Sequence, residues 1–158
     1  MYRPINLLLL TIPLIFFACG SDYAYQKEYT IPEEGWTYQD TLDFTFDIED
    51  TTSIYNLYLK IEHDKDYAFQ NLYTKVHTKF PGGERIAETL SLELADKAGG
   101  WQGNCSKKSY QLSIPIQKNA FFNATGAYKI TLEQFMRTDP VKGLHKIGFM
   151  LEKTAQTR

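Results

Sequence analysis

Apolar and polar residues alternate one by one along several segments of the chain, and this two-residue period is the feature that most limits its possible folds. The clearest examples are residues 42–48, LDFTFDI, and residues 54–63, IYNLYLKIEH. Alternation places every second side chain on the same face of an extended strand, whereas an amphipathic helix needs a period near 3.6. β-Branched and aromatic residues are frequent in both segments, which also favours strands. Both segments are therefore predicted to be strands with one buried face.

Weaker alternation continues along the rest of the chain, in residues 71–80, 86–94, 110–116, 128–132 and 147–151. Residues 86–94 contain Ala and Glu and would also tolerate a helix. About seven to eight strands, separated by turn residues and without a long amphipathic helix, are typical of an all-β fold, an antiparallel β-sandwich. The pattern does not separate a jelly-roll from an immunoglobulin-like topology.

The first nineteen residues have the layout of a bacterial lipoprotein signal. Arg3 gives a positive start, residues 5–18 are mostly apolar, and Cys19 follows the small residue Ala18. Such a signal is removed, which leaves Cys19 as an acylated N-terminus. A secretory signal cut near Ala18 without acylation is the main alternative. A transmembrane helix fits less well, because a bilayer needs roughly 20 apolar residues. The sequence therefore predicts lipid attachment at Cys19 and a place in the cell envelope.

The chain is predicted to have three parts. Residues 1–18 form the signal peptide, residues 19–34 a tether, and residues 35–158 a single β-sandwich domain. Residues 19–34 show no sustained apolar period, which favours a spacer between the domain and the membrane surface. The remaining length suits one domain with its own core.

Charge and cysteine content exclude two further classes of protein. The chain has 17 Lys and Arg against 19 Asp and Glu, a formal net charge of -2. A mildly acidic chain without basic clusters is not expected to bind nucleic acid. If Cys19 is acylated, Cys105 is the one remaining cysteine, so the fold is not held by a disulfide framework. Cys105 is predicted to be an ordinary loop or edge-strand residue.

The side chains able to carry catalysis are scattered along the sequence. The three histidines lie in different predicted strands, at spacings that match no zinc motif: His63, His77 and His145. A glycoside hydrolase would need two carboxylates brought together by the fold, and the candidates on a solvent-facing phase are Asp43, Asp47 and Glu93. Carboxylates are also ordinary solvent-facing residues of a half-buried strand. The chain is therefore predicted not to be an enzyme and to have no cofactor and no metal site.

The chain is rich in aromatic residues, with 11 Tyr, 10 Phe and 2 Trp. Most of them fall on the apolar phase of a predicted strand and are expected in the core. Tyr58 and Tyr73 fall on the opposite phase, and Trp101 lies in a loop with three nearby glycines. Exposed aromatic rings stack on sugars and contact partner proteins. Trp101, Tyr58 and Tyr73 are therefore the predicted binding residues.

A series of short segments carries a family resemblance. The segments are Gly35-Trp36; Ile48 and Asp50 before Tyr55-x-Leu57-x-Leu59; Tyr67 followed by Asn71-Leu72-Tyr73; Leu94-Ala95-Asp96; Gly100-Trp101-Gln102-Gly103; Gly126-x-Tyr128; Gln134-Phe135-Met136-Arg137; and Gly143-Leu144 ahead of Ile147-Gly148. In this order and spacing, from Cys19 to about Lys153, they resemble the GldH family of gliding-motility lipoproteins from Bacteroidetes.

The resemblance implies a lipid-anchored accessory of the gliding machinery, associated with type IX secretion and without known catalysis. Of the functional residues, only Cys19 transfers, as the lipidation site. We therefore expect a non-catalytic lipoprotein at the outer membrane that contacts other envelope proteins of the motility and secretion apparatus. The alternative is a carbohydrate-binding surface lipoprotein of the β-sandwich type, with glycans as its ligands.

Overall fold

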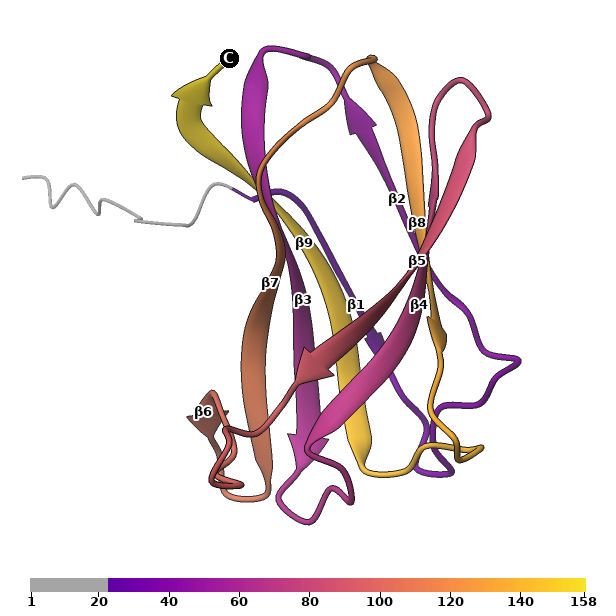
Figure 1. The fold of residues 1–158 in the computed structure, drawn as a ribbon, viewed down its shortest axis with the longest axis vertical. Helices are drawn as coiled ribbons and strands as arrows, with labels where there is room; N and C mark the ends of the chain where they lie inside the picture. The colour runs from indigo at the N-terminus through magenta and orange to yellow at the C-terminus, as the bar shows by residue number, and fades with distance from the viewer. Residues whose placement is uncertain (1–22) are drawn as a thin grey trace, which may run out of the picture.

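The computed structural model describes residues 23–158, which form β-strands and no helix (Figure 1). The strands of this part of the chain are β1 (Tyr23–Thr30), β2 (Leu42–Ile48), β3 (Ser53–Asp64), β4 (Asn71–Lys79), β5 (Arg85–Glu93), β6 (Asn104–Cys105), β7 (Ser109–Phe121), β8 (Gly126–Gln134) and β9 (Leu144–Thr157). None of residues 23–158 belongs to a helix long and apolar enough to cross a membrane.

The strands form two antiparallel sheets that pack face to face. One sheet has five strands in the order β1-β9-β3-β7-β6, and the other has four in the order β2-β8-β4-β5. Side chains from both sheets form one hydrophobic core. The predicted all-β, antiparallel sandwich is therefore confirmed.

The pairing of the strands is nested, as in a hairpin folded over on itself. If the two-residue β6 is set aside, β1 pairs with β9, β2 with β8, β3 with β7, and β4 with β5. Strands that follow one another along the chain mostly lie in opposite sheets. This is the arrangement of a jelly roll, so the structure selects that topology over the immunoglobulin-like alternative.

Strand β1 contradicts part of the predicted tether. Residues 23–30 were expected to be a spacer, but they pair with β9 from Tyr23↔Glu152 to Thr30↔Lys146. Aromatic residues supply the inward face of this strand. The Tyr25 ring lies 5.6 Å from that of Phe46, and the Tyr29 ring lies 5.3 Å from that of Phe44. The prediction of a tether is therefore wrong for residues 23–30. Cys19 and the predicted signal peptide lie outside the described residues.

The core follows the alternation of the sequence. Every second residue of β3 from Ser53 to His63 is buried, and so is every second residue of β2 from Leu42 to Ile48. The middle of the core is aromatic. The Phe46 ring lies 5.6 Å from the ring of Phe149 and 5.9 Å from that of Tyr128. Burial of these apolar faces is the main term that holds the two sheets together.

The sandwich has two ends that carry different connections. The end drawn at the top of Figure 1 carries the loops 49–52, 80–84 and 122–125. The opposite end carries the connections 31–41, 65–70, 94–103 and 135–143. We call them the upper end and the lower end.

Candidate functional site

A groove of about 980 Å³ lies at the lower end, where β4 begins and β8 ends. Its other walls come from β5 and from the connections 31–41, 65–70 and 135–143. Aromatic, thioether and guanidinium side chains dominate the lining, namely Tyr38, Phe69, Tyr73, Phe135, Met136 and Arg137. We call this site the aromatic groove.

Three rings in the aromatic groove are unusually exposed. Tyr38 is 45% exposed, Tyr73 is 43% exposed and Phe135 is 55% exposed. Exposed large apolar side chains that gather in one place mark interaction sites, because they leave apolar surface in water that a ligand or partner can cover. The groove is therefore the leading candidate site among the described residues.

Hydrogen bonds fix the backbone of the groove walls. The Tyr38 hydroxyl donates to the carbonyl oxygen of Met136 at 2.6 Å, which ties the connection 31–41 to the connection 135–143. The Phe135 amide donates to the carbonyl oxygen of Tyr73 at 2.9 Å. The Met136 amide donates to the side-chain oxygen of the buried Gln134 at 2.9 Å. The rings of the groove are thus presented from a backbone that is already ordered.

Trp36 positions the connection that carries Tyr38. Its ring is buried, its backbone bridges to Val141, and its indole N–H donates to the carbonyl oxygen of Asp40 at 2.6 Å. Gly35 has a φ of 109°, and a Cβ on it would lie 2.7 Å from the carbonyl oxygen of Val141. Only glycine allows this close approach of the two connections.

The groove borders a charged area on the outer face of the four-stranded sheet. Glu133, at the edge of the groove, lies 3.2 Å from His77 Nε2. Further along the same face, Lys129 Nζ lies 2.7 Å from Asp43 Oδ2. Polar and charged side chains therefore lie beside the aromatic walls, as they do at the polar rim of many protein interfaces.

The structure does not bring the three predicted binding residues together. Tyr73 lies in the aromatic groove. Tyr58 belongs to the other sheet and donates its hydroxyl to Glu152 Oε2 at 3.0 Å. Trp101 is half-buried, donates its indole N–H to the carbonyl oxygen of Lys65, and packs with its ring 4.7 Å from that of His63. Tyr73 is thus the predicted residue that lies in the candidate site.

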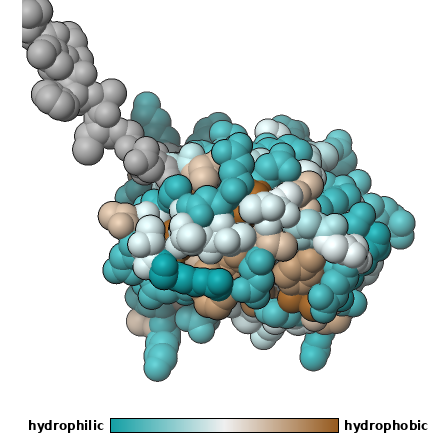
Figure 2. All heavy atoms as spheres, turned by 90° about the horizontal axis from the view of Figure 1, so that it is seen from above, coloured by the Kyte–Doolittle hydropathy of each residue, from teal (hydrophilic) through white to brown (hydrophobic). Residues whose placement is uncertain are grey.

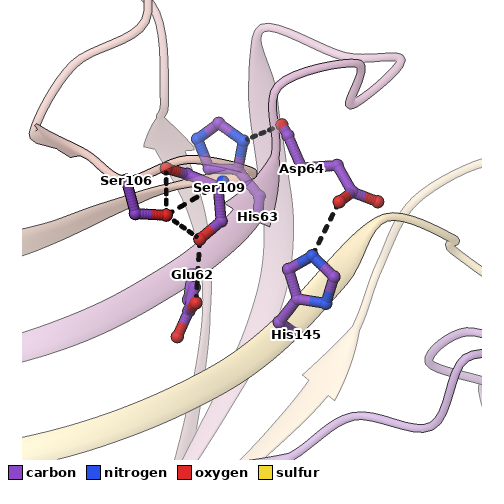
Figure 3. Close-up of polar contacts among 6 residues, drawn as sticks. All are labelled: Glu62, His63, Asp64, Ser106, Ser109 and His145. Atoms are coloured by element: carbon purple, nitrogen blue, oxygen red, sulfur yellow. Dashed lines mark hydrogen bonds and ion pairs between the residues drawn. The ribbon is translucent and has the colours of Figure 1, made fainter.

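Two of the three histidines meet at Asp64, at the lower end (Figure 3). Nδ1 of the fully buried His63 donates to the carbonyl oxygen of Asp64 at 2.8 Å, and His145 Nε2 lies 2.7 Å from Asp64 Oδ1. Burial lowers the pKa of His63, because the charged imidazolium would lose its hydration. His77 lies on the four-stranded sheet. No group of three or more His, Cys, Asp or Glu side chains placed to hold a metal occurs within residues 23–158.

Two serines lie beside this histidine cluster without contacting it (Figure 3). Ser109 Oγ donates to Glu62 Oε1 at 2.9 Å, and Ser106 Oγ lies 2.9 Å from Ser109 Oγ. A serine nucleophile needs a base such as histidine to accept its proton. In this cluster the hydroxyl of Ser109 instead holds the connection between β6 and β7 against β3.

The carboxylates considered for a hydrolase lie far apart. Asp43 and Asp47 are four residues apart on β2, which corresponds to roughly 13 Å along a strand. Glu93 lies on β5, three strand spacings from β2, or roughly 14 Å. Burial acts to raise the pKa of Asp43, but hydrogen bonds from Lys129 and Thr131 outweigh it and hold that pKa below its usual value. A glycosidase pair needs a separation of about 5–9.5 Å and a carboxyl group of raised pKa. These three carboxylates are too far apart for such a pair, and the pKa of Asp43 is lowered rather than raised.

The sequence contained a signal for the residues of the groove that were not predicted. In β8 the buried residues are Tyr128, Ile130, Leu132 and Gln134. Phe135 follows on the opposite phase, and it is therefore exposed. The same phase argument that singled out Tyr73 would have found Phe135. Tyr38 lies in a connection without periodicity, so only the fold reveals it.

The comparisons with known proteins agree with the family resemblance of the sequence segments described above. A model of the GldH lipoprotein family matches residues 23–151. The chain is 27% identical over 148 residues to a protein of Christiangramia forsetii named "Gliding motility lipoprotein GldH homolog", covering 89% of this chain and 90% of the relative. It is 24% identical over 153 residues to "Gliding motility lipoprotein GldH" of Flavobacterium johnsoniae, covering 92% of this chain and 94% of the relative. The family match spans nearly all of the described residues, and we conclude that this chain belongs to the GldH lipoprotein family.

Proposed function

We propose that this protein is a non-catalytic lipoprotein of the gliding-motility and type IX secretion-associated machinery, anchored in the outer membrane through Cys19. Its family and the names of its two relatives support a role in motility. The apolar segment that ends at Cys19 supports the anchor. In this proposal the protein acts by contacting other envelope proteins through the aromatic groove.

The observation that carries the contact role is the gathering of three exposed rings in one groove with ordered walls. Protein interfaces are enriched in Tyr, Phe, Met and Arg, and the groove contains Tyr38, Tyr73, Phe135, Met136 and Arg137. Because the wall backbone is already hydrogen-bonded, little conformational entropy remains to be lost when a partner binds. The groove therefore suits a partner that inserts apolar side chains between the rings.

A carbohydrate ligand is the second candidate, because Tyr38 and Tyr73 are exposed beside polar lining residues such as Asn71 and Glu133. Aromatic faces with nearby hydrogen-bonding groups also suit a sugar ring. Retention of the purified protein on envelope polysaccharide would favour this candidate over a protein partner, provided that Tyr73→Ser abolishes the retention.

Site-specific photo-crosslinking in the native host tests the contact role. A photoreactive amino acid at position 135 should form a discrete adduct with an envelope protein. The same probe at position 45, an exposed site on the outer face of the same sheet, should not. Equal adducts at both positions, or none at position 135, would contradict a partner in the groove.

Paired substitutions connect the groove to motility. The variant carrying both Tyr73→Ser and Phe135→Ser should lose partner binding by about 2 kcal/mol or more for each ring that is a hot spot, roughly 30-fold in Kd each. The matched control is Tyr58→Ser, which removes a partly exposed ring from the outer face of the other sheet. Colony spreading and secretion should fail in a deletion strain that expresses the double variant and recover with the control. Full recovery with the double variant would exclude the groove as the functional surface.

A further inference from the structure

The exposed large apolar side chains of the described residues fall into two sets at opposite ends of the sandwich. One set lines the aromatic groove. The other consists of Tyr23, which is 36% exposed, Ile86, which is 42% exposed, and Phe121, which is 51% exposed. Tyr23 begins β1, Ile86 is the second residue of β5, and Phe121 ends β7. All three lie toward the upper end, and the groove does not account for them.

The Phe121 ring contacts the cationic side chain of Arg158. The guanidinium carbon of Arg158 lies 4.9 Å from the centre of the Phe121 ring, and Nη1 of Arg158 donates to Asn123 Oδ1 at 3.3 Å. An exposed ring next to a guanidinium group suits the interface of a bilayer, where rings sit among the headgroups and guanidinium groups pair with phosphates. The chemistry of this corner therefore fits a lipid headgroup layer.

Between Ile86 and Phe121 the core opens toward solvent. A cavity of about 280 Å³ lies between the edges of β5 and β7, and the side chains lining it include Phe80, Ile86, Leu90, Ile116, Phe121 and Phe122. Figure 2 looks down on the upper end and shows apolar side chains at the surface among hydrophilic ones. A face of this kind keeps apolar surface in water unless something covers it.

The length of the chain before β1 identifies what covers this face. Tyr23 is four residues after Cys19. Four residues reach at most about 14 Å when fully extended. If acyl chains on Cys19 enter a bilayer, the first residue of β1 is held within that distance of the membrane surface. The sandwich cannot then place its upper end far from the lipid.

We propose that the upper end is a membrane-contact surface, on which Tyr23, Ile86 and Phe121 lie in the headgroup layer of the bilayer that holds the acyl chains. The inference rests on the proposed acylation of Cys19. It also orients the functional site. β3 has 12 residues and runs from the upper to the lower end, so the two ends are roughly 40 Å apart. The aromatic groove therefore faces away from the membrane, toward proteins that stand off its surface.

Fluorophores attached at single positions test the orientation. The full lipoprotein is purified from its native membrane in a Cys105→Ser background and reconstituted in vesicles of phosphatidylethanolamine and phosphatidylglycerol. Cysteines introduced by Phe121→Cys and Ile86→Cys report on the upper end, and those introduced by Tyr73→Cys and Phe135→Cys report on the groove. Each position is at least 42% exposed in the native protein, so the substitutions should leave the fold intact.

The readout is quenching of the fluorophore by lipids that carry a nitroxide on the headgroup. We expect a large loss of fluorescence at positions 86 and 121 and none at positions 73 and 135. Equal quenching at all four positions, or quenching at the groove positions alone, overturns the inference. Intact mass separates the two possible failures. An acylated chain with unquenched labels at 86 and 121 refutes the membrane-contact surface alone, whereas a chain without acyl mass refutes the anchor on which both proposals rest.

Discussion

Replacement of Phe149 by alanine should remove the centre of the aromatic core. The Phe149 side chain is fully buried on β9, an interior strand of the five-stranded sheet, and its ring lies 5.6 Å from that of Phe46, 5.7 Å from that of Phe44 and 6.1 Å from that of Tyr25. These neighbours belong to both sheets, and backbone ladders hold them in place. These neighbours cannot close over the cavity that the substitution leaves. Phe149→Ala should therefore lower the free energy of unfolding by about 3–5 kcal/mol, the usual range for Phe→Ala in a core.

Equilibrium unfolding in urea, followed by the fluorescence of Trp36 and Trp101, measures this loss on the chain without residues 1–18. In thermal unfolding of the same chain, Phe149→Ala should lower the melting temperature by roughly 10 °C or more for a domain of this size. Phe135→Ala removes the same side chain from a site that is 55% exposed, and it should change the free energy of unfolding by less than about 0.5 kcal/mol. Equal losses in the two variants, or a loss below about 1 kcal/mol for Phe149→Ala, would refute the assignment of Phe149 to a rigid core. If Phe149→Ala does not fold, Phe149→Leu should give an intermediate loss.

Two further predictions concern the lower end. Burial lowers the pKa of His63 below its usual 6.5, so the neutral ring is favoured in the folded state. The contribution of this ring to stability is therefore complete above pH 6.5 and is lost as the pH falls below that value. In urea titrations between pH 8 and pH 5, the free energy of unfolding should decline less for His63→Asn than for the native chain, and an equal decline would contradict this. Gly103 has a φ of 89°, and a Cβ there would overlap the carbonyl oxygen of Gln111 and the Cβ of Leu112. Gly103→Ala should therefore lower the free energy of unfolding by about 2–4 kcal/mol. Gly82→Ala, with nothing within 4 Å of its added Cβ, should leave it nearly unchanged in the same measurement.

The alternation of the sequence was enough to predict the strands that bury apolar aliphatic side chains. β2 and β3 lie where residues 42–48 and 54–63 predicted them. The alternation could not predict β1, because its inward residues are tyrosines and its other residues are mostly polar. Nor could it predict which strands pair, since β2 meets β8 across more than seventy residues of chain. That pairing depends on how complete apolar faces fit together, and no single segment encodes it.

The candidate site was predicted only in part, for a related reason. The phase of a strand shows that Tyr58 and Tyr73 point away from the core, and both do. It does not show that β3 and β4 lie in different sheets, which separates the two rings. Trp101 was predicted as a binding residue in a glycine-rich loop, but its ring packs on the buried His63 and does not line the groove. The groove itself is built from three connections and from parts of β4, β5 and β8, which only the folded topology brings together.

The nested order of the strands also sets when the domain can assemble. β1 pairs with β9 alone among the described strands, and β9, although last in the chain, lies between β1 and β3. Strand β1 thus has no hydrogen-bonded neighbour until residues 144–157 have been made. Pairings at such long sequence separation form slowly. Under the proposed anchoring through Cys19, we expect the exported polypeptide to stay unfolded until its last strand has crossed the inner membrane, which is the state that a translocation pore requires of its cargo.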